Sequence, residues 1–435
     1  LSARYMIFDC LKYCVADVMF HFACIICCCF LIVSKSCEKI CKQSVAFVDF
    51  LRDFAAGIGK SDISVFVNCD KFAFFEKSDS ALLIADPFAK NLVKDKLAAT
   101  EKKFGIKLYS CDFGGECSRN EVKKMQDFAK KNNCACTIGL GGGKAIDTAK
   151  CVAMGNNLII CPTIAATDAP TSHSAVLYTD DHHFDDYAYF KQNPSVVLID
   201  TTVVANAPAR FLVSGMGDAL STYFEARANV RSFSNVNAGL PCGANRATGE
   251  MLGYGTMAAA ALAELCYKTL LSDGTKALAA CEQHVVTPAL ERIIETNILL
   301  SGLGFESGGL AAAHAIHDGL TLLPAHTKFF HGEMVAFGTI CQLVLENSPE
   351  DELYEVLDFC LSVGLPVCLK DLGTDSIDDD LLKAVAEKTC IPDESVHNMP
   401  FPVTPDMVAA AIKTADAIGH AYKYGCEDEE CGCCH

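Results

Sequence analysis

The segment Cys134–Lys150, which reads CACTIGLGGGKAIDTAK, decides the fold. Its apolar beginning predicts a strand as far as Gly139, and a helical pattern follows from Lys144. Glycines between a strand and a helix lack Cβ atoms, so backbone N–H groups at the helix N-terminus can approach an anion. The spacing matches neither the dinucleotide fingerprint nor the Walker loop, and a plain structural turn is the alternative. The candidate pyrophosphate contacts are Gly141, Gly142, Gly143 and Lys144.

The sequence on both sides of this segment alternates short apolar runs with amphipathic stretches. Further strands are expected at residues 81–85, 106–109, 158–161 and 196–199, with helices between them. This βαβ order predicts a doubly wound parallel sheet. After Ala207 helical periodicity takes over, as in Met257–Leu271, Val286–Leu300 and Met334–Leu345. The second domain is therefore expected to be all-α.

A chain of 435 residues is too long for one ordinary core, so two domains are expected. The α/β dinucleotide-binding domain should span residues 46–207, and the helical domain residues 208–425. Residues 1–45 form an atypical apolar, cysteine-rich segment, and residues 426–435 form a cysteine-rich tail.

The composition restricts the class of partner. Hydrophobic residues make up 51% and charged residues 21% of the chain, which is typical of a packed globular protein. A net charge of -18 would repel a nucleic acid or an anionic membrane surface. A small-molecule partner is expected instead.

The chain contains 26 cysteines, and most lie singly inside apolar runs. Free cysteine behaves as a small buried hydrophobe, so these residues are interpreted as reduced core thiols in a reducing compartment. The tail is the exception, because it could hold a soft metal, although acidic residues interrupt it. Its candidate ligands are Cys426, Cys431, Cys433, Cys434 and His435.

The uncharged apolar stretch Val18–Val33 is shorter than the ~20 residues that a membrane-spanning helix needs. A cytoplasmic protein is expected and a membrane association is disfavoured. Organelle targeting, a tilted anchor and a misread gene segment stay as alternatives, since Lys12 and Lys35 flank the stretch.

Asp86 ends the first clear strand. A carboxylate at the carboxyl edge of such a sheet can accept hydrogen bonds from an adenosine ribose and would repel a 2′-phosphate. This position favours NAD over NADP. The alternative is a surface aspartate that opens a turn before Pro87.

Three segments of the helical half carry metal-ligand side chains among small residues: SGMGDAL around Asp218, AAAHAIHDG around His314 and FHGE around His331. Burying an unpaired carboxylate or imidazole in such surroundings would be costly. One carboxylate and two imidazoles suit Zn²⁺ or Fe²⁺ and leave a position open for a substrate oxygen. Spacing does not establish that the three meet, and each histidine could be a satisfied core residue.

Several long motifs together resemble the glycerol dehydrogenases, a family within the iron-containing alcohol dehydrogenase superfamily. The resemblance extends over about residues 81–419. It rests on FGGEC (113–117), GLGGGKAIDTAK (139–150), PTIAATDAP (162–170), GMGDALSTYFEARA (215–228), SGLGFESGGLAAAHAIHDGL (301–320), HGEMVAFGT (331–339) and HNMP (397–400).

The resemblance implies an α/β dinucleotide-binding domain followed by an all-α metal-binding domain, as in dehydroquinate synthase-like folds. It implies a homo-oligomer, an octamer in this family, and zinc more readily than iron. It assigns the metal ligands to Asp218, His314 and His331, and NAD contacts to Asp86, Gly143, Lys144, Thr163, Ser172 and Tyr178. Asp168 is implied as the catalytic residue that contacts the polyol, and His317 as a proton relay that does not bind the metal.

The implied reaction is NAD-dependent oxidation of glycerol, or a similar vicinal diol, to dihydroxyacetone, by hydride transfer from a metal-bound alkoxide. One alternative is a same-fold enzyme for a phosphorylated substrate, similar to glycerol-1-phosphate dehydrogenase, but few basic residues besides Lys328 lie near the metal motifs. A non-catalytic, membrane-tethered homologue is the other. The chain departs from the family at Ala166 and Ser174, and in extra residues between Ala228 and Ala258.

Overall fold

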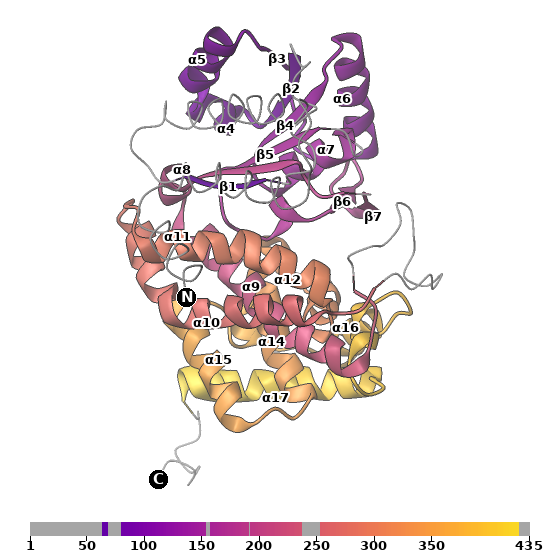
Figure 1. Ribbon diagram of the computed structural model, residues 1–435. Coiled ribbons are helices and arrows are strands. Elements are labelled where there is room, and N and C mark those ends of the chain that lie inside the picture. The colour runs from indigo at the N-terminus through magenta and orange to yellow at the C-terminus, as the bar shows by residue number, and fades with distance from the viewer. Residues whose placement is uncertain (1–62, 68–79, 154–156, 191, 237–252, 426–435) are drawn as a thin grey trace, which may run out of the picture.

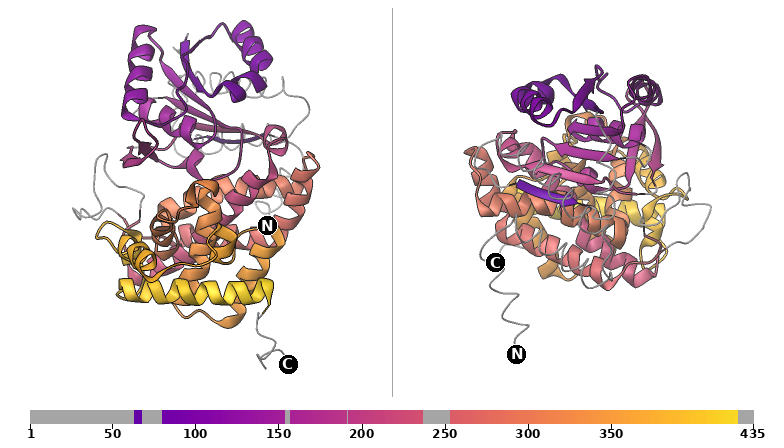
Figure 2. Two further views of the ribbon diagram at one scale, coloured as in Figure 1. Left: turned by 180° about the vertical axis from the view of Figure 1, so that it is seen from behind. Right: turned by 45° about the horizontal axis from the view of Figure 1, so that its top comes forward.

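The computed structural model describes residues 63–67, 80–153, 157–190, 192–236 and 253–425. Strands occupy one half of the molecule and long helices the other, as Figure 1 shows, and the two views in Figure 2 keep this division. The apolar stretch Val18–Val33, the tail 426–435 and residues 237–252 of the extra segment lie outside the described residues.

A six-stranded sheet in the order β1-β8-β5-β4-β2-β3 organises the N-terminal half. β1 pairs antiparallel with β8, and the other neighbours are parallel. β6 and β7 form a separate antiparallel hairpin. The sequence did not predict β1 or this hairpin. The strands are β1 (Ile63–Val67), β2 (Ser80–Ala85), β3 (Lys107–Ser110), β4 (Cys136–Gly141), β5 (Leu158–Pro162), β6 (Ser174–Tyr178), β7 (Phe184–Tyr189) and β8 (Val196–Asp200).

Helices bury both faces of the sheet. In β2, Leu82 and Ile84 belong to the large core, which also contains Ile146 of α7, whereas Leu83 packs in a second cluster with Ala89 of α4. The near-continuous apolar strands follow from this double burial. The expected doubly wound parallel sheet is confirmed. The helices of this half are α4 (Pro87–Leu92), α5 (Lys94–Phe104), α6 (Arg119–Lys131), α7 (Gly143–Ala153) and α8 (Thr201–Ala205).

The direction of winding changes between two neighbouring strands. From β2 the chain proceeds outward to β3, and from β4 it proceeds the other way to β5. Such a switch point opens a crevice at the carboxyl ends of the strands, where ligands bind in open α/β sheets. Asp86 follows β2 and Gly141 ends β4, so both lie at this edge.

The C-terminal half of the described chain is entirely helical, apart from one isolated bridge between Asn235 and Tyr254. The central helix is α9, and α17 runs along the side remote from the sheet (Figure 1). The predicted helix 286–300 is α11 continued by a π-helical turn. The helices are α9 (Ala209–Ser232), α10 (Met257–Glu282), α11 (Pro288–Glu295), the π turn η4 (Thr296–Leu300), α12 (Ser301–Gly308), α13 (Ala312–Leu320), α14 (His331–Leu345), α15 (Glu350–Val363), α16 (Asp379–Thr389) and α17 (Pro405–Tyr424).

The predicted domain boundary after Ala207 falls in the connection between α8 and α9. The limits of the four segments themselves stay predictions. Within the described ranges, no helix is both long enough and apolar enough to span a bilayer. The cysteines of these ranges are all free and most are buried, which confirms that they are core thiols there.

α9 and α14 cross in close contact because glycine occupies the crossing point on each helix. A Cβ on Gly217 would lie 2.2 Å from the carbonyl oxygen of Gly332, a separation that real Cβ atoms essentially never show. The residues next to these glycines are Asp218 and His331. The close crossing therefore brings two of the candidate metal ligands together.

We expect Gly217→Ala to lower the free energy of unfolding by about 1–3 kcal/mol. Alanine favours a helix by up to about 1 kcal/mol, but the backbone oxygen of Gly332 cannot move aside as a side chain could. Chemical denaturation measures the change. Gly143→Ala is the matched control, because a Cβ there meets nothing within 4 Å. Equal stabilities of Gly217→Ala and the unaltered protein would contradict this account of the crossing.

Candidate active site

Three helices bring the predicted metal ligands together. Asp218 lies in the middle of α9, His314 in α13, and His331 is the first residue of α14. One ligand atom from each lies within 4.8 Å of the others. The side chain of Asp218 is only 2% exposed, so the carboxylate of the cluster is buried.

Oδ1 of Asp218 is buried and accepts no hydrogen bond from the described residues. It lies 3.4 Å from Nε2 of His314 and 3.3 Å from Nε2 of His331. The other oxygen, Oδ2, accepts from the backbone N–H of Asp168 at 3.2 Å. A buried carboxylate oxygen without a donor is costly, and a cation at this point would compensate it. The donor set fits zinc or ferrous iron.

The neighbour of His314 fixes which nitrogen of that imidazole faces Asp218 with a lone pair. Nδ1 of His314 lies 2.6 Å from Glu225 Oε2, and an ionised carboxylate can only accept, so Nδ1 donates. In the neutral ring, Nε2 then presents a lone pair to Asp218. Oδ1 of Asp218 and Nε2 of the two histidines would then be three electron-rich atoms that face one another. Only a cation or added protons would relieve the repulsion between them.

The charges of the cluster and its neighbours shift the pKa values of Asp218 and His314. Burial alone would raise the pKa of Asp218, but His331 and His314 outweigh it and lower that pKa. Burial lowers the pKa of His314, yet Glu225 and Asp218 raise it well above its ordinary value. The carboxylates therefore make the centre strongly attractive to positive charge.

Glu225, which was not predicted from the sequence, orients His314. Its Oε1 accepts from the backbone N–H groups of Ala311 at 2.8 Å and His314 at 3.0 Å, besides the contact of its Oε2 with the imidazole. A carboxylate on the remote nitrogen of a ligand histidine fixes the ring and raises its basicity. Glu225 follows Asp218 by two helical turns on the buried face of α9, and this spacing could have indicated it.

His317 lies beside the cluster and contacts His331. Its Nδ1 lies 2.9 Å from Oδ1 of Asp318, and its Nε2 lies 3.2 Å from Nδ1 of His331. Burial first, then the nearby His331, lower the pKa of His317 to about 4. The ring is thus neutral near pH 7, and the Asp318 contact makes Nε2 the acceptor toward His331.

Asp168 occupies the junction between the sheet and the helical half. Its Oδ2 accepts a hydrogen bond from Ser301 Oγ at 2.8 Å, and its backbone N–H bonds Asp218. Burial, followed by the charge of Asp218, raises the pKa of Asp168 well above its usual range. Ser301, at the start of α12, was not identified from the sequence.

The glycine loop joins β4 to α7 and contacts Asp86. Gly141 has φ +143°, and a Cβ there would lie 2.7 Å from Oδ2 of Asp86, so this position requires glycine. Oδ1 of Asp86 caps α4 by accepting from the backbone N–H of Ala89 at 2.7 Å. The turn-opening interpretation of Asp86 is therefore correct for one oxygen, while the other faces the loop.

The remaining loop residues lie at the same edge of the sheet. Gly142 separates β4 from α7, and Gly143 has open space around it. The backbone N–H of Thr163, just after β5, bonds the carbonyl of Gly141 at 3.1 Å. The N-terminus of α7 thus points into an edge where an anion could be received.

Lys144 and Tyr178 lie together, with Nζ 5.9 Å from the ring centroid. The Lys144 ammonium is also 2.7 Å from Oε2 of Glu116, a buried carboxylate that the sequence analysis did not single out. Burial, then Asp147 and Glu116, raises the pKa of Tyr178 to about 12. Lys144 is therefore held near the start of α7 by Glu116.

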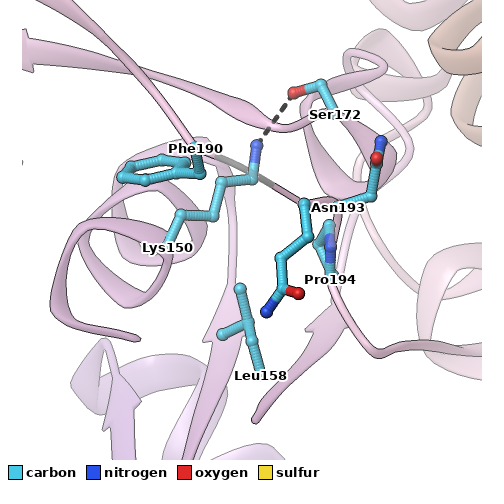
Figure 3. Close-up of a pocket in the computed structure, with 7 residues that line it drawn as sticks. Lys150, Leu158, Ser172, Phe190, Asn193 and Pro194 are labelled. Carbon is cyan, nitrogen blue, oxygen red and sulfur yellow. Dashed lines mark hydrogen bonds between the residues drawn. The ribbon is translucent and has the colours of Figure 1, made fainter. Parts of the chain in front are cut away.

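Ser172 is buried, and its hydroxyl accepts from the ammonium of Lys150 at 3.0 Å. Figure 3 shows Lys150 extending toward Ser172 across a small pocket. Lys150, another residue that the sequence analysis missed, is buried although charged. The pocket is lined by Lys150, Leu158, Ser172, Phe190, Gln192, Asn193 and Pro194.

Comparisons with known proteins agree with this architecture. Residues 69–201 match the family model described as iron-containing alcohol dehydrogenase. A glycerol dehydrogenase of Escherichia coli O6:H1 is 48% identical over 78% of this chain and 90% of its own length. A glycolaldehyde reductase of Halobacterium salinarum is 43% identical, over 78% of this chain and 90% of its own.

A solved structure extends the likeness to three dimensions. The crystal structure of glycerol dehydrogenase from Schizosaccharomyces pombe aligns with a TM-score of 0.73 at 38% identity. The alignment covers 79% of this chain and 84% of that one. With the switch-point edge, the helical half and the three converging side chains, these likenesses show that the chain belongs to the iron-containing alcohol dehydrogenase family, in the group that contains the glycerol dehydrogenases.

Proposed function

We propose that this protein oxidises glycerol, or a similar vicinal diol, with NAD as the electron acceptor, giving dihydroxyacetone from glycerol. The observation that carries the proposal is the convergence of Asp218, His314 and His331 beside Asp168. Similarity to glycerol dehydrogenases over most of the chain supports the choice of substrate.

Asp218, His314 and His331 would hold a divalent cation, which supplies Lewis acidity that favours loss of a proton from an alcohol. Asp168 would contact a second hydroxyl of the diol, because it lies next to Asp218 through its backbone N–H. Its carboxylate can accept a hydrogen bond from that hydroxyl. A substrate with two adjacent hydroxyls would use both groups.

The cofactor would lie along the switch-point edge. The backbone of Gly141, Gly142 and Gly143 and the N-terminus of α7 would receive the pyrophosphate, and Asp86 the adenosine ribose. NAD supplies the hydride acceptor. The other proposed contacts are Lys144, Thr163, Ser172 and Tyr178.

His317 would move the proton that leaves the substrate. The proton would enter its neutral ring at Nε2, the basic nitrogen, in place of the hydrogen bond from His331, and the proton on Nδ1 would pass to Asp318. A chain of hydrogen bonds with neutral imidazole in the middle can pass a proton along.

A phosphorylated substrate is the less favoured alternative. A site for a phosphorylated substrate is expected to gather basic side chains, but Arg210 near His331 is paired with Glu333 at 2.6 Å, and Lys150 donates to acceptors of its own half. A small hydroxyaldehyde is a second candidate substrate, for the reverse reaction, because of the similarity to a glycolaldehyde reductase.

We further propose that the metal is zinc, that the chain forms a homo-oligomer, an octamer by resemblance to the family, and that the protein is cytoplasmic. Zinc is favoured over iron by the family resemblance, since two imidazoles and a carboxylate suit either ion. Size-exclusion chromatography with light scattering and cell fractionation test the last two.

Metal analysis combined with a substrate panel tests the function. The purified protein should contain about one zinc per chain, as three ligands make one site. It should reduce NAD with glycerol and propane-1,2-diol faster than with propane-1,3-diol or glycerol 1-phosphate, because only vicinal diols without a phosphate engage both groups. A metal-free protein with full activity would refute the proposal.

We expect His314→Ala to lose bound metal and more than about 99% of turnover while binding NADH almost normally. One of three ligands disappears, whereas the switch-point edge is untouched. Metal content, initial rates and nicotinamide fluorescence measure the three effects. His183→Ala is the matched control, since that imidazole is 80% exposed in the hairpin turn and is not one of the candidate ligands. Lost NADH binding with retained metal would contradict the assigned roles.

Asp86→Asn should narrow the preference for NAD over NADP by about tenfold, which corresponds to the loss of one charge contact. Asparagine can still cap α4 but no longer repels a 2′-phosphate. The ratio of kcat/KM for the two cofactors measures the effect. Asp112→Asn serves as the control for removing a carboxylate, and an unchanged ratio in Asp86→Asn would place the ribose elsewhere.

A further inference from the structure

The ammonium of Lys150 is buried at the last turn of α7, with 2% of the residue exposed. Lysine is almost never fully buried unless its charge has partners. Nζ donates to the carbonyl of Ala169 at 2.5 Å, to Ser172 Oγ at 3.0 Å and to the carbonyl of Ser174 at 2.7 Å. An ammonium has three donors, so all of them are used on one short segment.

Asp147, one turn earlier on α7, binds the same segment. Its Oδ1 lies 3.4 Å from the Lys150 ammonium, and its Oδ2 accepts from the backbone N–H of Val176 at 3.1 Å. α7 therefore holds residues 169–176 through a buried ion pair. Figure 3 shows the lysine end of this arrangement.

The helical half holds the other side of the segment. Ser301 donates to Asp168, and Thr171 Oγ1 donates to the carbonyl of Ile298 at 2.8 Å. The backbone N–H of His173 bonds Oε2 of Glu306 at 2.9 Å. Residues 168–176, here called the bridging segment, thus connect α7 of the sheet half with η4 and α12 of the helical half.

The bridging segment contains one proposed group for each substrate of the reaction. Asp168 lies beside the metal-ligand cluster, and Ser172 is a proposed NAD contact whose hydroxyl is held by Lys150. Placement errors near 1 Å can lower turnover strongly, so what fixes this segment matters for the chemistry.

We propose that Lys150 is a positioning residue that fixes the bridging segment, and through it Ser172 and Asp168, without itself touching substrate or cofactor. This inference rests on the proposed function. A charge is suited to the task because a buried cation orients three acceptors at once, two of them backbone carbonyls. None of its contacts involves the three metal ligands.

A double-mutant cycle of Lys150→Met and Ser172→Ala tests the proposal. Lys150→Met should raise KM for NAD and lower kcat, each by about tenfold or more, with metal content unchanged. Ser172→Ala should have little further effect in that background, because its hydroxyl acts only when Lys150 holds it. A purely structural role of Lys150 would lower the midpoint of unfolding and leave the two effects additive.

Hydrogen exchange provides a readout that needs no turnover. Amides of residues 169–176 should exchange about tenfold faster in Lys150→Met than in the unaltered protein. Lys413→Met is the matched control, because that lysine forms an exposed ion pair with Asp379 at 2.8 Å. It should change neither exchange in the bridging segment nor KM.

Normal kinetics in Lys150→Met, or additive effects in the cycle, would overturn the proposal. If Lys150→Met does not fold, Asp147→Asn decides, since it is isosteric: a KM for NAD raised about fivefold supports the proposal, and an unchanged KM overturns it. If none of the diols supports reduction of NAD by the unaltered protein, the proposed function fails. The exchange rates then still decide whether Lys150 fixes the segment.

Discussion

The buried carboxylate of Asp218, facing two imidazole nitrogens, is the interaction on which the arrangement of the helical half depends. Three electron-rich atoms can share this space only with a positive charge among them. Each ligand comes from a different helix, so α9, α13 and α14 must all pack correctly before the centre exists. The glycine crossing of α9 and α14 and the Glu225 contact with His314 fix two of these three relations.

The sheet half supplies a different kind of binding surface. Its switch point places backbone N–H groups and one carboxylate at an edge, which suits a long, flexible, anionic cofactor. The candidate metal cluster, by contrast, offers side chains from three helices around the buried carboxylate of Asp218. The bridging segment 168–176 joins the two, because α7 holds it on one side and α12 on the other.

Buried charged side chains from both halves hold the bridging segment. Lys150 with Asp147, and Glu306 with the backbone of His173, both lie in or against the bridging segment. Removing one member of such a pair is costly, because the other stays buried without its partner. These pairs therefore favour one relative placement of the segment over slightly shifted ones.

The sequence by itself determined the doubly wound sheet and the helical second half, and it singled out Asp218, His314 and His331 as candidate ligands, which the structure brings together. Periodicity and a strand–glycine–helix order are local, and metal ligands stand out among small apolar residues. The partners that set each group's geometry were decided by the tertiary structure alone. Glu225 is 89 residues from His314, and Ser301 is 133 residues from Asp168. Such contacts, like the antiparallel pairing of β1 with β8, depend on how distant elements pack, which no local pattern records.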